Sequence, residues 1–199
     1  MSKKIIFATL NEGKIKEVKM ILQELGCEVL SMKDVGIQID IEENGITYEE
    51  NAIIKAKAIM ERTGEIVLAD DSGLEVDYLD QAPGVYSARY LGEDTSYKVK
   101  NEHIISQLEG VTGDGRSARF ISAIACVFPN GEIITTRAAL EGLIGFEEKG
   151  ENGFGYDPIF FLPEFNCTTG ELPLDQKNKI SHRGKALEKM KELIRNRLS

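Results

Sequence analysis

The segment KKIIFATLNEGKIKEVKMILQELGCEVL, residues 3–30, decides the fold class of this chain. Residues 3–9 are apolar and β-rich, and residues 27–30 have the same character. Between these two runs, apolar residues recur at helical spacing over residues 13–25, and Gly26 ends the pattern. A strand, a helix and a second strand in this order, with the strands parallel, are typical of an α/β fold.

Two further helices and a short strand are predicted in the middle of the chain. Thr47 and Glu50 form a capping box, which predicts a helix that begins there and ends at Gly64. Residues 66–69 have the character of a short buried strand. Apolar residues on one face predict another helix over residues 96–108.

A β-hairpin is predicted at Asn130-Gly131, because this dipeptide favours the turn that joins two antiparallel strands. The flanking strands cover residues 118–128 and 132–143. A short strand at 158–162 and a basic amphipathic helix at 183–197 follow. The sequence therefore predicts an α/β fold with a central mixed, twisted sheet flanked by helices.

The composition limits the classes of function. A length of 199 residues suits a single domain, and no separable linker divides it. The chain has 24 basic and 33 acidic residues, and the net charge of −9 disfavours binding to nucleic acid or to an anionic membrane. No apolar run suits a membrane helix or a signal peptide. Three cysteines without CxxC spacing predict reduced thiols in a cytoplasmic protein.

The first candidate site is Thr9-Leu10-Asn11-Glu12-Gly13-Lys14, where the first strand ends and the first helix begins. Ligands of α/β proteins bind at the carboxyl ends of strands, and the free N–H groups of a helix N-terminus suit phosphate. Lys14 adds a positive charge, although the segment lacks the P-loop pattern. The alternative is an asparagine cap followed by an exposed lysine.

The second candidate site is Asp70-Asp71-Ser72-Gly73, directly after the strand predicted at residues 66–69. Two adjacent carboxylates repel each other, and a divalent cation, which prefers oxygen ligands, would relieve that repulsion. A metal-bound or base-activated water would then be available for hydrolysis. The alternative is a solvated turn closed by Gly73.

Two more candidate sites lie in the last third of the chain. Gly153-Phe154-Gly155-Tyr156-Asp157-Pro158 carries two aromatic rings that can face a planar ligand, and Asp157 can accept hydrogen bonds from ring N–H groups. The alternative is a turn that packs in the core. Residues 177–183 concentrate hydrogen-bond donors, including His182, in an otherwise acidic chain. The alternative here is a helix cap at Ser181 before a solvated basic helix.

In this order, the motifs resemble the inosine/xanthosine triphosphate pyrophosphatase family over essentially the whole chain. Each motif alone is weak, but the complete series is specific. The motifs are Thr9-x-Asn11-x-x-Lys14, Glu50-Asn51-Ala52-x-x-Lys55-Ala56, Ala69-Asp70-Asp71-Ser72-Gly73-Leu74, Pro83-Gly84-x-Tyr86-Ser87-Ala88-Arg89, Phe154-Gly155-Tyr156-Asp157-Pro158 and Ser181-His182-Arg183. Leu10 departs from the pattern, since the family usually has a small residue there.

The resemblance implies an enzyme of two lobes with the active cleft between them, usually a homodimer. It implies hydrolysis of the deaminated purine nucleoside triphosphates ITP, dITP and XTP to the monophosphate and pyrophosphate. Mg²⁺ would bridge protein carboxylates and phosphate oxygens. The alternatives are a pyrophosphatase for other modified nucleoside triphosphates and a nucleotide-binding regulator without catalysis.

The resemblance also implies roles for individual residues. Asp71 is expected to be the proton acceptor and a metal ligand, with Glu43 as the second metal ligand and Glu42 as its alternative. The residues expected at or near the phosphates are Thr9, Leu10, Asn11, Glu12, Gly13, Lys14, Lys55 and Arg89. The other expected substrate contacts are Ser72, Phe154, Gly155, Tyr156 and Asp157, and, at the edge of the base, Lys177, His182 and Arg183.

Overall fold

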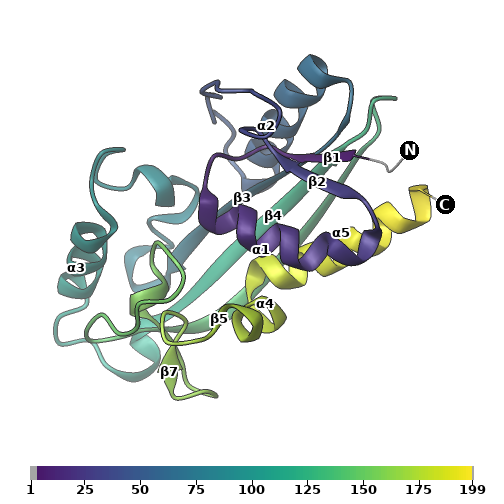
Figure 1. Cartoon of the computed structure of the whole chain (residues 1–199). Coiled ribbons are helices and arrows are strands. Elements are labelled where there is room, and N and C mark those ends of the chain that lie inside the picture. The colour runs from purple at the N-terminus through teal and green to yellow at the C-terminus, as the bar shows by residue number, and fades with distance from the viewer. Residues whose placement is uncertain (1–3, 199) are drawn as a thin grey trace. The chain divides into compact units, whose positions relative to one another are not determined.

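The computed structural model describes residues 4–198, whose elements are shown in Figure 1. The chain divides into two compact units. Unit 1 comprises the described parts of Met1–Asp71, Ser122–Ala138 and His182–Ser199, and unit 2 comprises Ser72–Ile121 and Ala139–Ser181. Three strands contribute residues to both units, namely β3 (Ile66–Val76), β4 (Ser117–Val127) and β5 (Ile133–Ile144).

The strands form one seven-stranded mixed sheet in the order β2-β1-β3-β4-β5-β6-β7. β1 (Lys4–Phe7) pairs in parallel with both β2 (Glu28–Ser31) and β3. β6 (Phe160–Leu162) pairs antiparallel with β5 and with β7 (Cys167–Thr168). The predicted α/β class with a mixed sheet is therefore confirmed.

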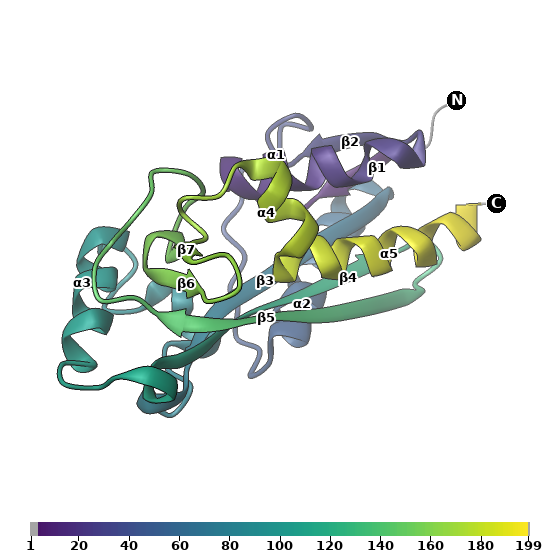
Figure 2. The same cartoon turned by 90° about the horizontal axis from the view of Figure 1, so that it is seen from below.

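Unit 1 contains helices α1 (Glu12–Leu22), α2 (Tyr48–Thr63) and α5 (His182–Leu198). Figures 1 and 2 show α1 and α5 side by side. Because successive residues of a strand point to opposite faces, Phe7 and Leu68 pack with α1 and α5, whereas Val67 and Ala69 pack with α2. Unit 1 thus has one apolar core on each face of its strands.

Unit 2 has a core of its own, built around α3 (Tyr97–Gln107) and the parts of the strands that this unit contains. Phe120 and Phe160 stack in this core with their ring centroids 4.2 Å apart. The buried guanidinium of Arg116 donates to the backbone carbonyls of Leu108 and Ile144. These carbonyls lie at the ends of α3 and β5, so Arg116 satisfies their hydrogen-bonding capacity next to the core.

The helix boundaries follow the local signals. The side chain of Thr47 accepts from the N–H of Glu50, which confirms the predicted cap of α2. Gly26 adopts φ +63° after the 3-10 turn Gln23–Leu25, as expected of a residue that ends a helix. The short helix α4 (Leu174–Ile180) was not predicted, because seven residues carry too little periodicity. Among residues 4–198, no helix combines the length and apolar character that crossing a membrane requires.

The alternative interpretation of Asp70-Asp71-Ser72-Gly73 as a solvated turn is wrong, because β3 continues through these residues to Val76. β1 pairs only with residues 66–68 of β3, and β4 is the other neighbour of β3 in the sheet. Asp70 and Asp71 therefore lie within a strand, just beyond the point where the pairing with β1 stops.

Candidate functional site

The segment between β1 and α1 ends in a capped helix N-terminus. The Oδ1 atom of Asn11 accepts from the N–H of Lys14 at 3.1 Å and caps the helix. The hydroxyl of Thr9 accepts from the N–H of Asn11 at 3.2 Å, and Leu10 is exposed. The segment thus leaves the carboxyl end of β1 as a capped turn, and Glu12 and Gly13 begin the helix.

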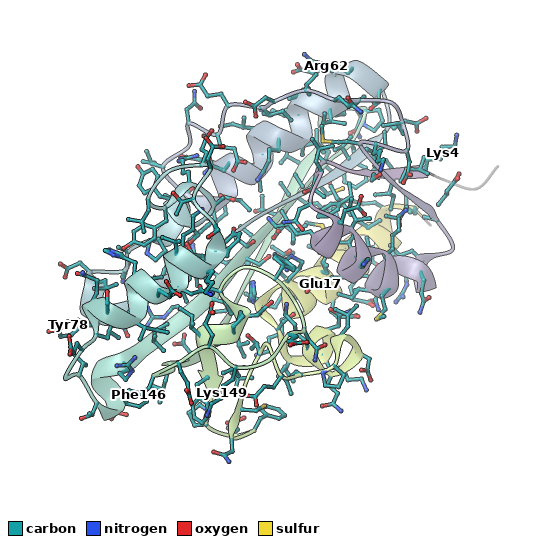
Figure 3. All side chains as sticks on the ribbon, turned by 60° about the vertical axis from the view of Figure 1, so that its left-hand side comes forward. Lys4, Glu17, Arg62, Tyr78, Phe146 and Lys149 are labelled. Carbon is teal, nitrogen blue, oxygen red and sulfur yellow. The ribbon has the colours of Figure 1, made fainter. Side chains whose placement is uncertain are left out.

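Lys14 is not the exposed lysine of the alternative interpretation, because its ammonium lies 2.7 Å from Oδ2 of Asp70. Oδ1 of Asp70 accepts from the hydroxyl of Ser122 at 2.6 Å, and Oδ2 accepts from Nε and Nη2 of Arg183, each at 3.2 Å. The Nη1 atom of Arg183 donates to Glu17 on α1, which is labelled in Figure 3. Two anions and two cations therefore alternate through the interior of unit 1.

These cations keep Asp70 ionised. Burial by itself would raise the pKa of Asp70, but Arg183 and Lys14 hold that pKa well below its ordinary value. Burial lowers the pKa of Lys14, and the charge of Asp70 opposes this effect. The repulsion predicted between the adjacent carboxylates is thus relieved on the Asp70 side by two side chains of the protein.

Asp71 points to the other face of β3, toward α2. Its Oδ2 atom accepts from Nδ2 of Asn51 at 3.1 Å, and its Oδ1 atom lies 3.5 Å from the ammonium of Lys55. The same ammonium lies 3.0 Å from Oε2 of Glu43. Asn51 and Lys55 are four residues apart on α2, so they lie on one face of that helix.

The pKa of Asp71 is raised. Burial is the largest cause, the neighbouring charge of Glu43 adds to it, and the ammonium groups of Lys55 and Lys14 oppose it. Asp71 is therefore a stronger base than an ordinary aspartate, which suits a carboxylate that takes a proton from water.

The carboxylates of Glu43 and Asp71 both lie beside the ammonium of Lys55. In residues 4–198 no three His, Cys, Asp or Glu side chains are grouped tightly enough to hold a metal by themselves. Glu43 and Asp71 nevertheless converge on one ammonium group, so their oxygens face a common point. Mg²⁺ is usually held by one or two carboxylates together with phosphate and water oxygens.

In unit 2, the loop around Phe154 and Tyr156 is held rigidly. Gly153 and Gly155 adopt φ +77° and +67°, which favour glycine. The hydroxyl of Tyr156 donates to the carbonyl of Ser87 at 2.7 Å, and the rings of Tyr156 and Tyr97 are perpendicular with centroids 5.2 Å apart. The first turns of α3 therefore support this aromatic loop.

Asp157 closes the loop. Its Oδ2 atom accepts from the N–H of Phe154 at 2.8 Å and from the ammonium of Lys177 at 2.7 Å. Its Oδ1 atom accepts from the hydroxyl of Thr169 at 2.9 Å. Gly153 allows this closure, since a Cβ atom there would lie 2.2 Å from Oδ2 of Asp157. Asp157 thus accepts from one N–H of the loop and from two side chains that lie outside it.

Arg89 ends the 3-10 helix Gly84–Arg89, also in unit 2. Its guanidinium lies 5.0 Å from the centre of the Tyr86 ring. The hydroxyl of Ser87 accepts from the N–H of Leu74 at 2.9 Å and so ties this helix to β3, the strand that carries Ser72.

The three donors predicted at the base edge lie on two helices, α4 and α5. Lys177 belongs to α4 in unit 2, where its ammonium lies 4.9 Å from the centre of the Phe154 ring. His182 and Arg183 begin α5 in unit 1, and both are buried. In this structure the polar groups of Arg183 are directed at Asp70 and Glu17, not presented as open donors.

A model of the Ham1 family matches residues 5–193 of this chain. The chain belongs to the Ham1 family.

Curated relatives match almost the full length of this Ham1 family chain. It is 49% identical to the dITP/XTP pyrophosphatase of Bacillus licheniformis, and the match covers 96% of this chain and 98% of that protein. It is 51% identical to the dITP/XTP pyrophosphatase of Desulforamulus reducens, with 98% and 96% covered. The solved structure of the Staphylococcus aureus Ham1 protein is 38% identical, covers 98% of this chain and 100% of its own, and has a TM-score of 0.86. The family resemblance predicted from the motifs is confirmed.

Several residues of this Ham1 family site were not predicted. Asn51 stands within one of the motifs, and its position four residues before Lys55 was the available signal. Ser122 and Glu17 have no local signal, because they reach Asp70 and Arg183 only through the packing of distant segments. Asn101 donates to the carbonyl of Gly155 at 3.3 Å, and no local pattern in the sequence predicts this contact.

Proposed function

We propose that this chain hydrolyses ITP, dITP and XTP to the monophosphate and pyrophosphate. The observation that carries the proposal is the grouping in unit 1 of a capped helix N-terminus with Lys14, Lys55, Glu43 and Asp71. The names of the relatives, which are dITP/XTP pyrophosphatases at about half identity over nearly the whole length, support the same reaction.

In the proposed reaction the triphosphate binds at the N-terminus of α1. The N–H groups of Glu12 and Gly13 and the hydroxyl of Thr9 donate to phosphate oxygens, and the ammonium of Lys14 supplies positive charge. Arg183 and Ser122 also lower the pKa of Asp70. Asp70 therefore stays ionised when the ammonium of Lys14 contacts phosphate.

Asp71 accepts the proton of the attacking water. The water oxygen bonds to the α-phosphorus, the bond between that phosphorus and the oxygen bridging to the β-phosphate breaks, and pyrophosphate leaves. A Mg²⁺ ion held by Glu43 and Asp71 would neutralise phosphate charge and lower the pKa of water. Lys55 contributes a further positive charge beside both carboxylates.

The proposal assigns the base to residues of unit 2. The rings of Phe154 and Tyr156 line the base, and Lys177 offers donors to its keto oxygen. Hypoxanthine and xanthine carry a keto oxygen at C6, whereas adenine carries an amino donor there. A site of donors therefore favours ITP and XTP over ATP.

Two further points belong to the same proposal. The chain acts as a homodimer, which sedimentation equilibrium measures. It works in the cytoplasm, and three cysteines without CxxC spacing in the sequence are in keeping with this location.

The test is pyrophosphate release from ITP, dITP, XTP, GTP, ATP and modified pyrimidine triphosphates, with and without Mg²⁺. We expect Mg²⁺-dependent release that is fastest for ITP, dITP and XTP. Preference for a modified pyrimidine triphosphate would favour a related pyrophosphatase. Nucleotide binding without release from any substrate would favour the non-catalytic regulator.

A further inference from the structure

We propose that Asn51 is a positioning residue, which fixes the carboxylate of Asp71 relative to the loop that carries Glu43. The inference rests on the proposed function, because that function gives Asp71 and Glu43 their roles. All the residues involved belong to unit 1.

The side chain of Asn51 is fully buried and uses both ends of its amide. Its Nδ2 atom donates to Oδ2 of Asp71 at 3.1 Å, and its Oδ1 atom accepts from the N–H of Gly45 at 2.8 Å. Exchanging the oxygen and nitrogen would set an oxygen against a carboxylate and an NH₂ group against an N–H donor. Only one orientation of the amide therefore satisfies both neighbours.

The backbone at Gly45 is built for this contact. A Cβ atom at Gly45 would lie 2.7 Å from Oδ1 of Asn51 and 2.7 Å from Cβ of Glu50. The next N–H group, that of Ile46, donates to Oε2 of Glu50 at 2.7 Å. Two consecutive N–H groups of the loop are thus bound by consecutive side chains of α2, and Glu43 lies two residues before the first of them.

This arrangement joins the two carboxylates by a rigid connection. Asn51 occupies Oδ2 of Asp71, and Oδ1 of Asp71 is the atom near Lys55. Glu43 reaches the same ammonium from the loop that Asn51 fastens. Asn51 therefore determines both the orientation of the Asp71 carboxylate beside the ammonium and where the loop places Glu43. Partners of this kind around a metal site typically affect affinity or activity by about 10–100-fold.

A purely structural role would make a different prediction, because Asn51 also ties down the residues that precede α2. In that case its loss would lower the thermal stability of the protein and leave the turnover of the folded enzyme unchanged. The test must therefore separate turnover from stability.

The experiment compares three variants with a matched control. Asn51→Ala removes both hydrogen bonds, whereas Asn51→Asp keeps an acceptor for Gly45, removes the donor to Asp71 and adds a carboxylate. Gly45→Ala forces the loop away from Asn51 without changing a polar side chain. The control is Thr136→Val, which removes another buried hydrogen bond of unit 1, from the Thr136 hydroxyl to the carbonyl of Ala186 at 2.9 Å.

For each protein we would measure kcat and KM for ITP, the melting temperature, and Mn²⁺ binding by electron paramagnetic resonance with pyrophosphate present. We expect Asn51→Ala and Gly45→Ala to lower kcat and weaken Mn²⁺ binding, each by about 10-fold or more, with KM for ITP changed by less than about 3-fold. Asn51→Asp lowers kcat similarly but does not weaken Mn²⁺ binding, because it adds a carboxylate. Thr136→Val lowers only the melting temperature.

Wild-type kcat in Asn51→Asp would overturn the proposal, as would losses in Asn51→Ala no larger than those in Thr136→Val. If the wild-type protein releases no pyrophosphate, the proposed function fails separately. The Mn²⁺ titration then decides alone, and unchanged binding in Asn51→Ala and Gly45→Ala would refute the positioning role.

Discussion

Asp70 and Asp71 are consecutive residues of β3, yet their carboxylates contact partners on opposite faces of that strand. Asp70 contacts Lys14 and Arg183 on the side of α1 and α5. Asp71 contacts Asn51 on α2, on the other side. The pKa of Asp70 is lowered by its two cations and that of Asp71 is raised by burial. Strand alternation thus gives one carboxylate a structural charge and the other the properties of a base.

Asp71→Asn should abolish most of the turnover while the fold and nucleotide binding survive. The amide cannot take a proton from water, and loss of a general base costs about 10²–10⁴-fold in rate. The measurement is kcat for ITP at saturating Mg²⁺, with binding of IMP as the control for the fold. A variant that keeps more than about a tenth of the wild-type kcat would remove Asp71 from this role.

Asp70→Asn should destabilise the protein, whereas Asp71→Asn should leave its stability unchanged or raise it. Without Asp70, Lys14 and Arg183 lose the carboxylate that both of them contact, and breaking a buried ion pair costs about 3–5 kcal/mol. Urea unfolding of both variants at neutral pH measures the difference in the free energy of unfolding. Equal losses in the two variants would contradict the separate roles.

The stabilisation from Asp70 should disappear in acid. The folded pKa of Asp70 lies below its unfolded value near 3.8, so its contribution is complete above that value and is lost as the pH falls toward the folded pKa. We expect the gap in unfolding free energy between wild type and Asp70→Asn to be largest at neutral pH and to shrink below about pH 4. Urea unfolding at a series of pH values tests this, and a gap that widens in acid would have the wrong sign.

Asp157→Asn should loosen the aromatic loop of unit 2. The single amide oxygen can still accept from the N–H of Phe154, but the NH₂ group then replaces the oxygen that accepts from Thr169, and the side chain offers Lys177 no counter-charge. Since the proposal assigns Phe154 and Tyr156 to the base, KM for ITP should rise several-fold while kcat stays within about 3-fold. The measurement is steady-state kinetics with ITP, which give KM and kcat of the variant and the wild type. A fall in kcat at unchanged KM would instead place Asp157 at the reacting phosphates.

The element order was predictable because its signals are local. The cap at Thr47 lies within one turn of the helix that it starts, and the Asn130-Gly131 turn joins β4 and β5 as predicted. The extent of β3 was not predictable, because pairing beyond residue 69 depends on β4, whose first residue is Ser117. Helix α4 was not predicted, because a helix of seven residues shows too little periodicity.

The sequence by itself determined the α/β class, the family and the short motifs that carry the site residues. Periodicity, helix caps and each single motif are formed by residues that are close together in the chain. Only the tertiary structure decided the partners of those residues. Asp70 meets Ser122 and Arg183, which are 52 and 113 positions away, and Lys177 lies in a different unit from Arg183. Which charges neutralise one another, and therefore which carboxylate has a raised pKa, depends on burial and on distances across the fold.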